Sequence, residues 1–141
     1  MLIVYLLFQV SCTREYVITD DQLDEDMLYL ETGIIPFSGD CKLIYRKSGS
    51  TRGSFSYKNG KTEGIATGYY PDGNLKWKGN FKDGLMTGIW LFYDGEGNKI
   101  YEMEYKNDSL HGKFVSWNRE GIITEESKYA MNTRIMNSSG I

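Results

Sequence analysis

Polar residues recur at every second position in several segments of this chain. Positions 54, 56, 78, 80, 102, 104, 126 and 128 are Ser, Ser, Lys, Asn, Glu, Glu, Glu and Lys, and the residues next to them on either side are mostly aromatic or otherwise apolar. Successive side chains of a β-strand point to opposite faces of a sheet. These segments are therefore predicted to be strands with one solvated face and one apolar face.

A second kind of segment is apolar at both alternating sets of positions, as in Ile89, Trp90, Leu91, Phe92 and Tyr93. A strand with this pattern is expected to be covered on both faces. Residues 20–37, where an acidic stretch leads into apolar residues, are the predicted cover. The same residues would cap one edge of a sheet, which native proteins do not leave open.

The two kinds of segment alternate with a period of 24 residues, and such a period indicates a repeat protein. Asp108 stands where the period calls for a glycine, and this residue type tolerates a left-handed backbone. The repeat-defining positions are Tyr45, Tyr69, Tyr93 and Trp117; Tyr57, Phe81, Tyr105 and Tyr129; Gly73, Gly97 and Gly121; Gly64, Gly88 and Gly112; and Gly84 and Trp90.

Turn residues close both ends of each unit, for example in Tyr70-Pro71-Asp72-Gly73 and Lys82-Asp83-Gly84. Connections this short join antiparallel strands. The sequence therefore predicts an all-β fold of tandem 24-residue β-hairpin repeats that form a single elongated antiparallel meander sheet. Four repeats are expected over residues 37–129, after an N-terminal lead-in and cap at 13–36. Residues 130–141 lose the period, with Asn132 at a glycine position, and are predicted to be a frayed tail.

Residues 1–12 are predicted to be a processing segment. Eleven uncharged and mostly apolar residues precede Cys12. This stretch is far shorter than the roughly 20 apolar residues that span a bilayer, but it suits the apolar region of a secretory signal. It resembles a bacterial lipoprotein signal that ends at a lipidated Cys12, which implies export and membrane attachment. The alternatives are a buried first strand and an anchoring or disordered end.

Composition and charge argue against several kinds of chemistry. Sixteen Lys and Arg against nineteen Asp and Glu leave a net charge of −3, which provides no basic surface for nucleic acid. Two cysteines form no metal-ligand pattern. Cys41 has no neighbouring base and is predicted to be a half-buried thiol, and His111, the only histidine, a solvated turn residue. No catalytic residue, metal, cofactor or small-molecule substrate is predicted.

The aromatic columns are interpreted as core packing, with a stacking platform for bases or sugars as the alternative. The unit Gly88-Ile89-Trp90-Leu91-Phe92-Tyr93, followed by Tyr105-Lys106-Asn107, resembles the variant MORN repeat of bacterial proteins. Pro36-Phe37-Ser38-Gly39 is similar to the segment before such arrays in YwqK-like proteins. Lys42 and Ala66 replace the tryptophan in the first two units, which are therefore expected to pack less tightly.

The resemblance implies a binding role, because proteins similar to this one are often described as antitoxin components, and MORN repeats elsewhere are linked to scaffolding or lipid contact. We predict a non-catalytic module that binds another protein, anchored as a lipoprotein at the bacterial cell envelope. The alternative is a cytosolic YwqK-like antitoxin that neutralises a partner toxin. Export separates the two, because an exported lipoprotein does not meet a cytosolic target.

Overall fold

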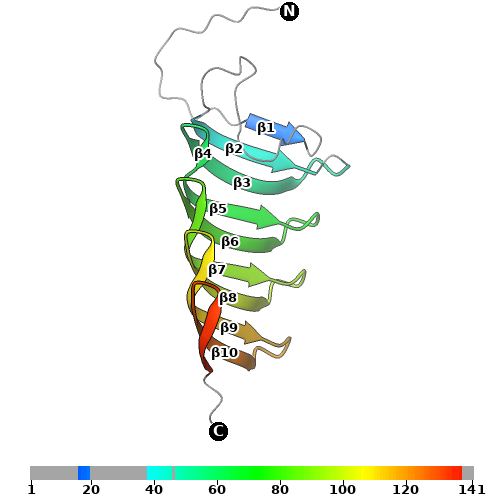
Figure 1. The fold of residues 1–141 in the computed structure, drawn as a ribbon. Coiled ribbons are helices and arrows are strands. Elements are labelled where there is room, and N and C mark those ends of the chain that lie inside the picture. The colour runs from blue at the N-terminus through cyan, green and yellow to red at the C-terminus, as the bar shows by residue number, and fades with distance from the viewer. Residues whose placement is uncertain (1–15, 20–37, 46, 138–141) are drawn as a thin grey trace, which may run out of the picture.

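The structure is a computed structural model that describes residues 16–19, 38–45 and 47–137. All regular elements in this part are strands, which form one open sheet in the order β1-β2-β3-β5-β6-β7-β8-β9-β10-β11, with β4 paired to β3. Figure 1 shows the hairpins stacked along one axis. The predicted all-β meander is confirmed. The strands are β1 Tyr16–Thr19, β2 Gly39–Ile44, β3 Thr51–Lys58, β4 Lys61–Thr62, β5 Gly64–Tyr69, β6 Leu75–Lys82, β7 Leu85–Tyr93, β8 Lys99–Lys106, β9 Ser109–Trp117, β10 Ile123–Ala130 and β11 Thr133–Asn137.

Strand β1 departs from the meander because it pairs with β2 in parallel, with Val17 opposite Lys42. A parallel pair needs a longer connection than a hairpin turn, and the chain between these two strands includes residues 20–37. The cover predicted for those residues lies outside the described part of the structure. The signal predicted for residues 1–12 lies outside it as well.

One side of the ladder is made of two-residue turns. In each turn both central residues have positive φ, between 49° and 84°. This is the backbone of a type I′ turn, whose twist matches that of the strands it joins. The N–H groups of Gly84, Asp108 and Asn132 donate to carbonyl groups at the preceding turn, so consecutive turns are tied together. The four turns are Asn59-Gly60, Asp83-Gly84, Asn107-Asp108 and Met131-Asn132.

Asp108 and Asn132 replace the turn glycine without ending the array. Their Oδ1 atoms accept hydrogen bonds from the backbone N–H groups of Met86 and Leu110, both at 2.7 Å. A glycine cannot make this bond, and Asp and Asn tolerate the left-handed backbone. The prediction of a frayed tail is therefore wrong for residues 130–137, where β11 pairs with the end of β10.

The other side of the ladder carries longer loops. Tyrosine hydroxyl groups connect each of the first two loops to the repeat that follows it. The hydroxyl of Tyr70 donates to the carbonyl of Tyr93 at 2.9 Å. In the same way, the hydroxyl of Tyr45 donates to the carbonyl of Tyr69 at 2.8 Å. These bonds tie the loop ends of successive hairpins, as the backbone bonds tie the turns on the opposite side.

The first hairpin is shifted by one residue relative to the 24-residue period. Ile44 pairs with Thr51 at the loop end of this hairpin, where Tyr69 pairs with Leu75 in the next one. Tyr45 therefore corresponds in structure to Tyr70, and not to Tyr69 as the spacing predicts. The loop after Tyr45 is one residue longer, and the shift exchanges the two faces of β2 because side chains alternate along a strand.

As a result, Cys41 and not Lys42 occupies the column of Ala66, Trp90 and Phe114. Cys41 pairs with Phe55 and is 1% exposed, so its thiol is fully buried rather than half-buried as predicted. Lys42 lies on the opposite face, across from Ser54. Ala66 is 2% exposed. Both residues that occupy the tryptophan column in the first two hairpins are therefore buried.

We predict that Asp108→Ala destabilises the protein by about 1–3 kcal/mol. The substitution places alanine in a left-handed backbone and removes the hydrogen bond to Met86. Asp108→Asn is the matched control and should stay within about 0.5 kcal/mol, because asparagine fills the equivalent role at position 132. Urea unfolding followed by tryptophan fluorescence measures both. Equal unfolding midpoints for Asp108→Ala and the wild type would contradict this account of the turn.

Candidate functional site

Aromatic rings cover one face of the sheet, which we call the aromatic face, and they form its core. Ring centroids are 5.8 Å apart for Phe55 and Trp77, 5.4 Å for Trp77 and Trp90, and 6.2 Å for Trp90 and Tyr105. These separations are typical of favourable aromatic pairs. Trp90 is 4% exposed and sits at the centre of this group. Its burial supports core packing over a stacking platform for ligands.

Three glycines of the sheet make room for these rings. A Cβ atom at Gly68 would overlap the indole of Trp77, and one at Gly79 would overlap the indole of Trp90. The ring of Phe55 packs against Gly53 in the same way. These glycines lie outside the 24-residue columns, so the period of the sequence does not reveal them. The signal available was that Gly68 falls opposite Trp77 once the hairpin is paired.

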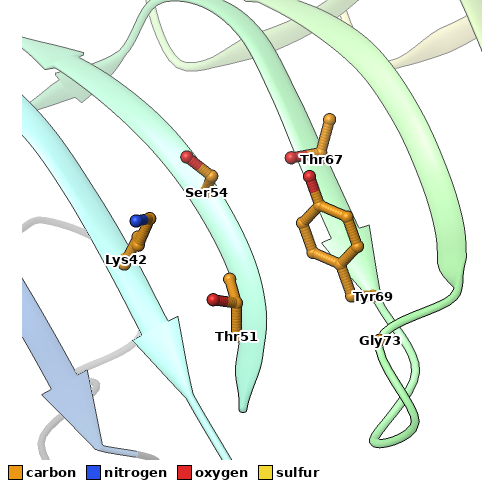
Figure 2. A pocket seen from close by; sticks show the side chains of 6 residues that line it. All are labelled: Lys42, Thr51, Ser54, Thr67, Tyr69 and Gly73. Carbon is orange, nitrogen blue, oxygen red and sulfur yellow. The ribbon is translucent and has the colours of Figure 1, made fainter.

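The opposite face, which we call the polar face, carries a line of four side chains across β2, β3, β5 and β6. Lys42, Ser54, Thr67 and Lys78 stand opposite one another in succession. A hollow of about 370 Å³ opens along this line. Its lining, drawn in Figure 2, consists of Lys42, Thr51, Ser54, Thr67, Tyr69 and Gly73.

The hollow is rich in groups that can form hydrogen bonds. Thr51 and Ser54 come from β3, and Thr67 and Tyr69 come from β5 (Figure 2). None of these four hydroxyl groups has a protein partner among the described residues. The ammonium group of Lys42 adds a positive charge, and no acidic residue is part of the lining. The site can therefore donate and accept hydrogen bonds beside a cation.

The other residues considered for chemistry lie apart from this hollow. His111 is half-buried in β9, not in a solvated turn as predicted, because β9 begins directly after the two-residue turn at 107–108. Its Nδ1 atom is buried without a partner in the described part of the chain. Burial raises the pKa of the Cys41 thiol, which makes it a poor nucleophile. The described residues contain no cluster of three metal-ligating side chains.

Residues 62–83 and 86–107 match the MORN repeat variant family. The first match contains the whole hairpin β5–β6, and the second contains the hairpin β7–β8 except for Leu85. Repeats of this family are generally non-catalytic. A comparison with curated proteins gives no match. The comparisons support a repeat protein of MORN type and do not confirm the YwqK-like antitoxin family. No helix in the described ranges has the length and apolar character needed to cross a membrane.

We predict that Gly79→Ala destabilises the protein by about 1–3 kcal/mol, because the added methyl group displaces the packed indole of Trp90. Gly95→Ala is the control, since a Cβ atom there meets open space and the backbone φ is not positive. The control should change stability by no more than about 0.5 kcal/mol. Thermal unfolding by circular dichroism distinguishes the two variants. If both variants unfold at the same temperature as the wild type, the packing of the Trp90 ring does not require a glycine at position 79.

Proposed function

We propose that this protein is a non-catalytic protein-binding module that uses its polar face. The observation that carries the proposal is a pair of exposed isoleucines at equivalent positions of neighbouring repeats. Ile65 is 62% exposed and Ile89 is 59% exposed. They are separated by one intervening strand, β6, which places their backbones roughly 10 Å apart. Two large apolar side chains at fixed spacing can serve as anchors for a partner.

The surroundings of this pair fit a protein contact. Asn80 stands opposite Ile65, and Glu104 stands opposite Ile89. Apolar anchors surrounded by polar groups are the usual composition of a protein–protein interface. The aromatic face contributes less, because its central side chain, Trp90, is already buried by neighbouring rings. A sheet of stacked repeats also presents an extended and rigid surface.

The proposal places the module at the bacterial cell envelope, attached through a lipid on Cys12. The support is the uncharged, mostly apolar stretch of eleven residues that precedes this cysteine. A single acyl chain gives only marginal membrane binding, so a stable anchor needs more than one. The alternative function, a cytosolic antitoxin, requires the unprocessed chain in the cytosol. The form of the recovered protein therefore separates the two functions.

We expect a photo-crosslinking amino acid at position 65 or 89 to trap the same protein in the native cell. Position 123, another exposed isoleucine at the far end of the sheet, is the control and should not trap it. The double variant Ile65→Asp and Ile89→Asp should weaken the isolated complex at least tenfold, about 1.4 kcal/mol. Trapping at position 123 alone, or at none of the three positions, would rule out Ile65 and Ile89 as the anchors of the binding surface.

We expect the full chain, expressed in its native cell type, to appear in the membrane fraction with an intact mass that starts at Cys12 and includes acyl chains. Cys12→Ala should leave the chain uncleaved and without acyl chains, because it removes the residue that is lipidated. Mass spectrometry of the separated membrane and cytosol provides the measurement. If the wild-type chain is found unprocessed in the cytosol, this result would rule out the envelope role and favour the antitoxin alternative.

A further inference from the structure

Strand β6 separates the two exposed isoleucines of the proposed binding surface (Figure 1). Ile65 stands opposite Asn80 in this strand. Lys78 and Lys82 lie two residues to either side of Asn80, so they share its face and are the diagonal neighbours of Ile65. Ile89 lies on the other side of β6, next to the same polar-face side chains. The two isoleucines are therefore flanked by a pair of cations.

Both lysines are exposed, and neither makes an ion pair or hydrogen bond among the described residues. The carboxylates of neighbouring strands form hydrogen bonds with backbone groups instead. The Oε2 atom of Glu63 accepts one from the N–H of Asp83 at 2.9 Å, and Oε2 of Glu104 accepts one from a backbone N–H of β9 at 3.1 Å. The described part of the chain therefore does not neutralise the ammonium groups of Lys78 and Lys82.

Two further lysines gather at the turn end of the same surface. Lys58 and Lys61 stand directly opposite each other across a two-residue turn, and both are exposed. Like charges in this arrangement are unfavourable, and neither lysine has an ion-pair partner within the described ranges. Together with Lys82 in the following hairpin, they outnumber the one carboxylate in these two turns, that of Asp83. This end of the surface therefore has an excess of positive charge.

The last repeat shows how the chain satisfies the same positions elsewhere. An offset of 48 residues relates Ile65 to Lys113 and Lys78 to Glu126. The Nζ atom of Lys113 lies 3.5 Å from Oε1 of Glu126, so a cation and a carboxylate of the same chain form a pair there. At the earlier site the chain provides an apolar side chain and a cation. The carboxylate is the missing group, and a partner can supply it.

We propose that the partner contributes an acidic segment in the polyproline II conformation, an inference that rests on the proposed protein-binding function. Ile65 and Ile89 are roughly 10 Å apart, and a polyproline II helix advances about 9.3 Å in each turn of three residues. Two apolar residues three positions apart can therefore contact both isoleucines. In a β-strand, residues three positions apart point to opposite sides and cannot do so.

The two residues between these apolar positions complete the match. In a polyproline II helix they point to opposite flanks of the segment, and Lys78 and Lys82 lie on opposite sides of Asn80 in the strand beneath it. Asp or Glu at both positions can then form a charge-assisted hydrogen bond with one lysine each. The expected motif is apolar-acidic-acidic-apolar, and it runs across the strands from β5 to β7.

The test titrates a fluorescent peptide, Pro-Leu-Glu-Glu-Leu-Pro, with the full chain and measures fluorescence anisotropy. Each proline favours an extended backbone for itself and for the residue before it. We expect saturable binding that weakens as salt is added. Pro-Leu-Gln-Gln-Leu-Pro, without the charges, and Pro-Ala-Glu-Glu-Ala-Pro, without the apolar anchors, should each bind at least about fivefold more weakly. The absence of saturable binding by the first peptide, or equal binding by either of the others, would overturn the proposal.

Two double variants locate the binding on the chain. Lys78→Gln combined with Lys82→Gln should weaken binding of the first peptide at least about fivefold. The matched control combines Lys47→Gln with Lys128→Gln, which removes two exposed lysines elsewhere and changes the net charge equally. The control should keep the affinity within about twofold, because salt screens distant exposed charges. Unchanged binding by the first variant, or an equal loss in both, would contradict a site at β6. Thermal unfolding shows that each variant is folded.

Cross-linking at position 65 in the native cell separates this inference from the function on which it rests. We expect mass spectrometry of the trapped protein to place the cross-link in a segment with two acidic residues between apolar ones. If the same protein is trapped at positions 65 and 89 through a segment without acidic residues, the binding function stands and the acidic segment is wrong. If neither position traps a protein, both proposals fail.

Discussion

The packing of aromatic rings directly onto glycine backbone is the contact on which the rest of this sheet depends. The described strands form a single layer, so apolar side chains gain burial chiefly by lying along their own sheet. The rings of Trp77 and Trp90 achieve this only because Gly68 and Gly79 carry no Cβ atom beneath them. Each ring also touches the next, which joins separate hairpins into one core. The opposite face is thereby left available for polar side chains.

Hydrogen bonds at both ends of the hairpins hold the neighbouring repeats in register. Backbone bonds connect successive turns on one side, and the hydroxyl groups of Tyr45 and Tyr70 connect successive loops on the other. Because every such bond reaches only the next repeat, the array is stabilised by contacts between neighbours. A local change in one hairpin can therefore persist without disturbing hairpins further along.

The sequence allows the hairpins to be predicted, because alternation and turn chemistry are local properties of the chain. It does not reveal the shift of β2, since a residue count cannot show that the loop after Tyr45 holds one residue more than the loop after Tyr70. The continuation of the array past Asn132 was missed for a related reason. A side-chain bond to Leu110 replaces the glycine there, and that bond joins residues 22 positions apart.

The same shift explains why the hollow could not be predicted from the sequence. In the 24-residue alignment Lys42 falls in the tryptophan column and therefore faces the core, where a charge without a partner is unfavourable. The longer loop moves Cys41 into that column, where a small buried thiol fits beside Phe55. Lys42 then faces the polar side, next to short hydroxyl side chains instead of the apolar residues found later in the array. One inserted residue thus both preserves the core and creates the basic hollow, because reversing the face of a strand changes the two sides of the sheet together.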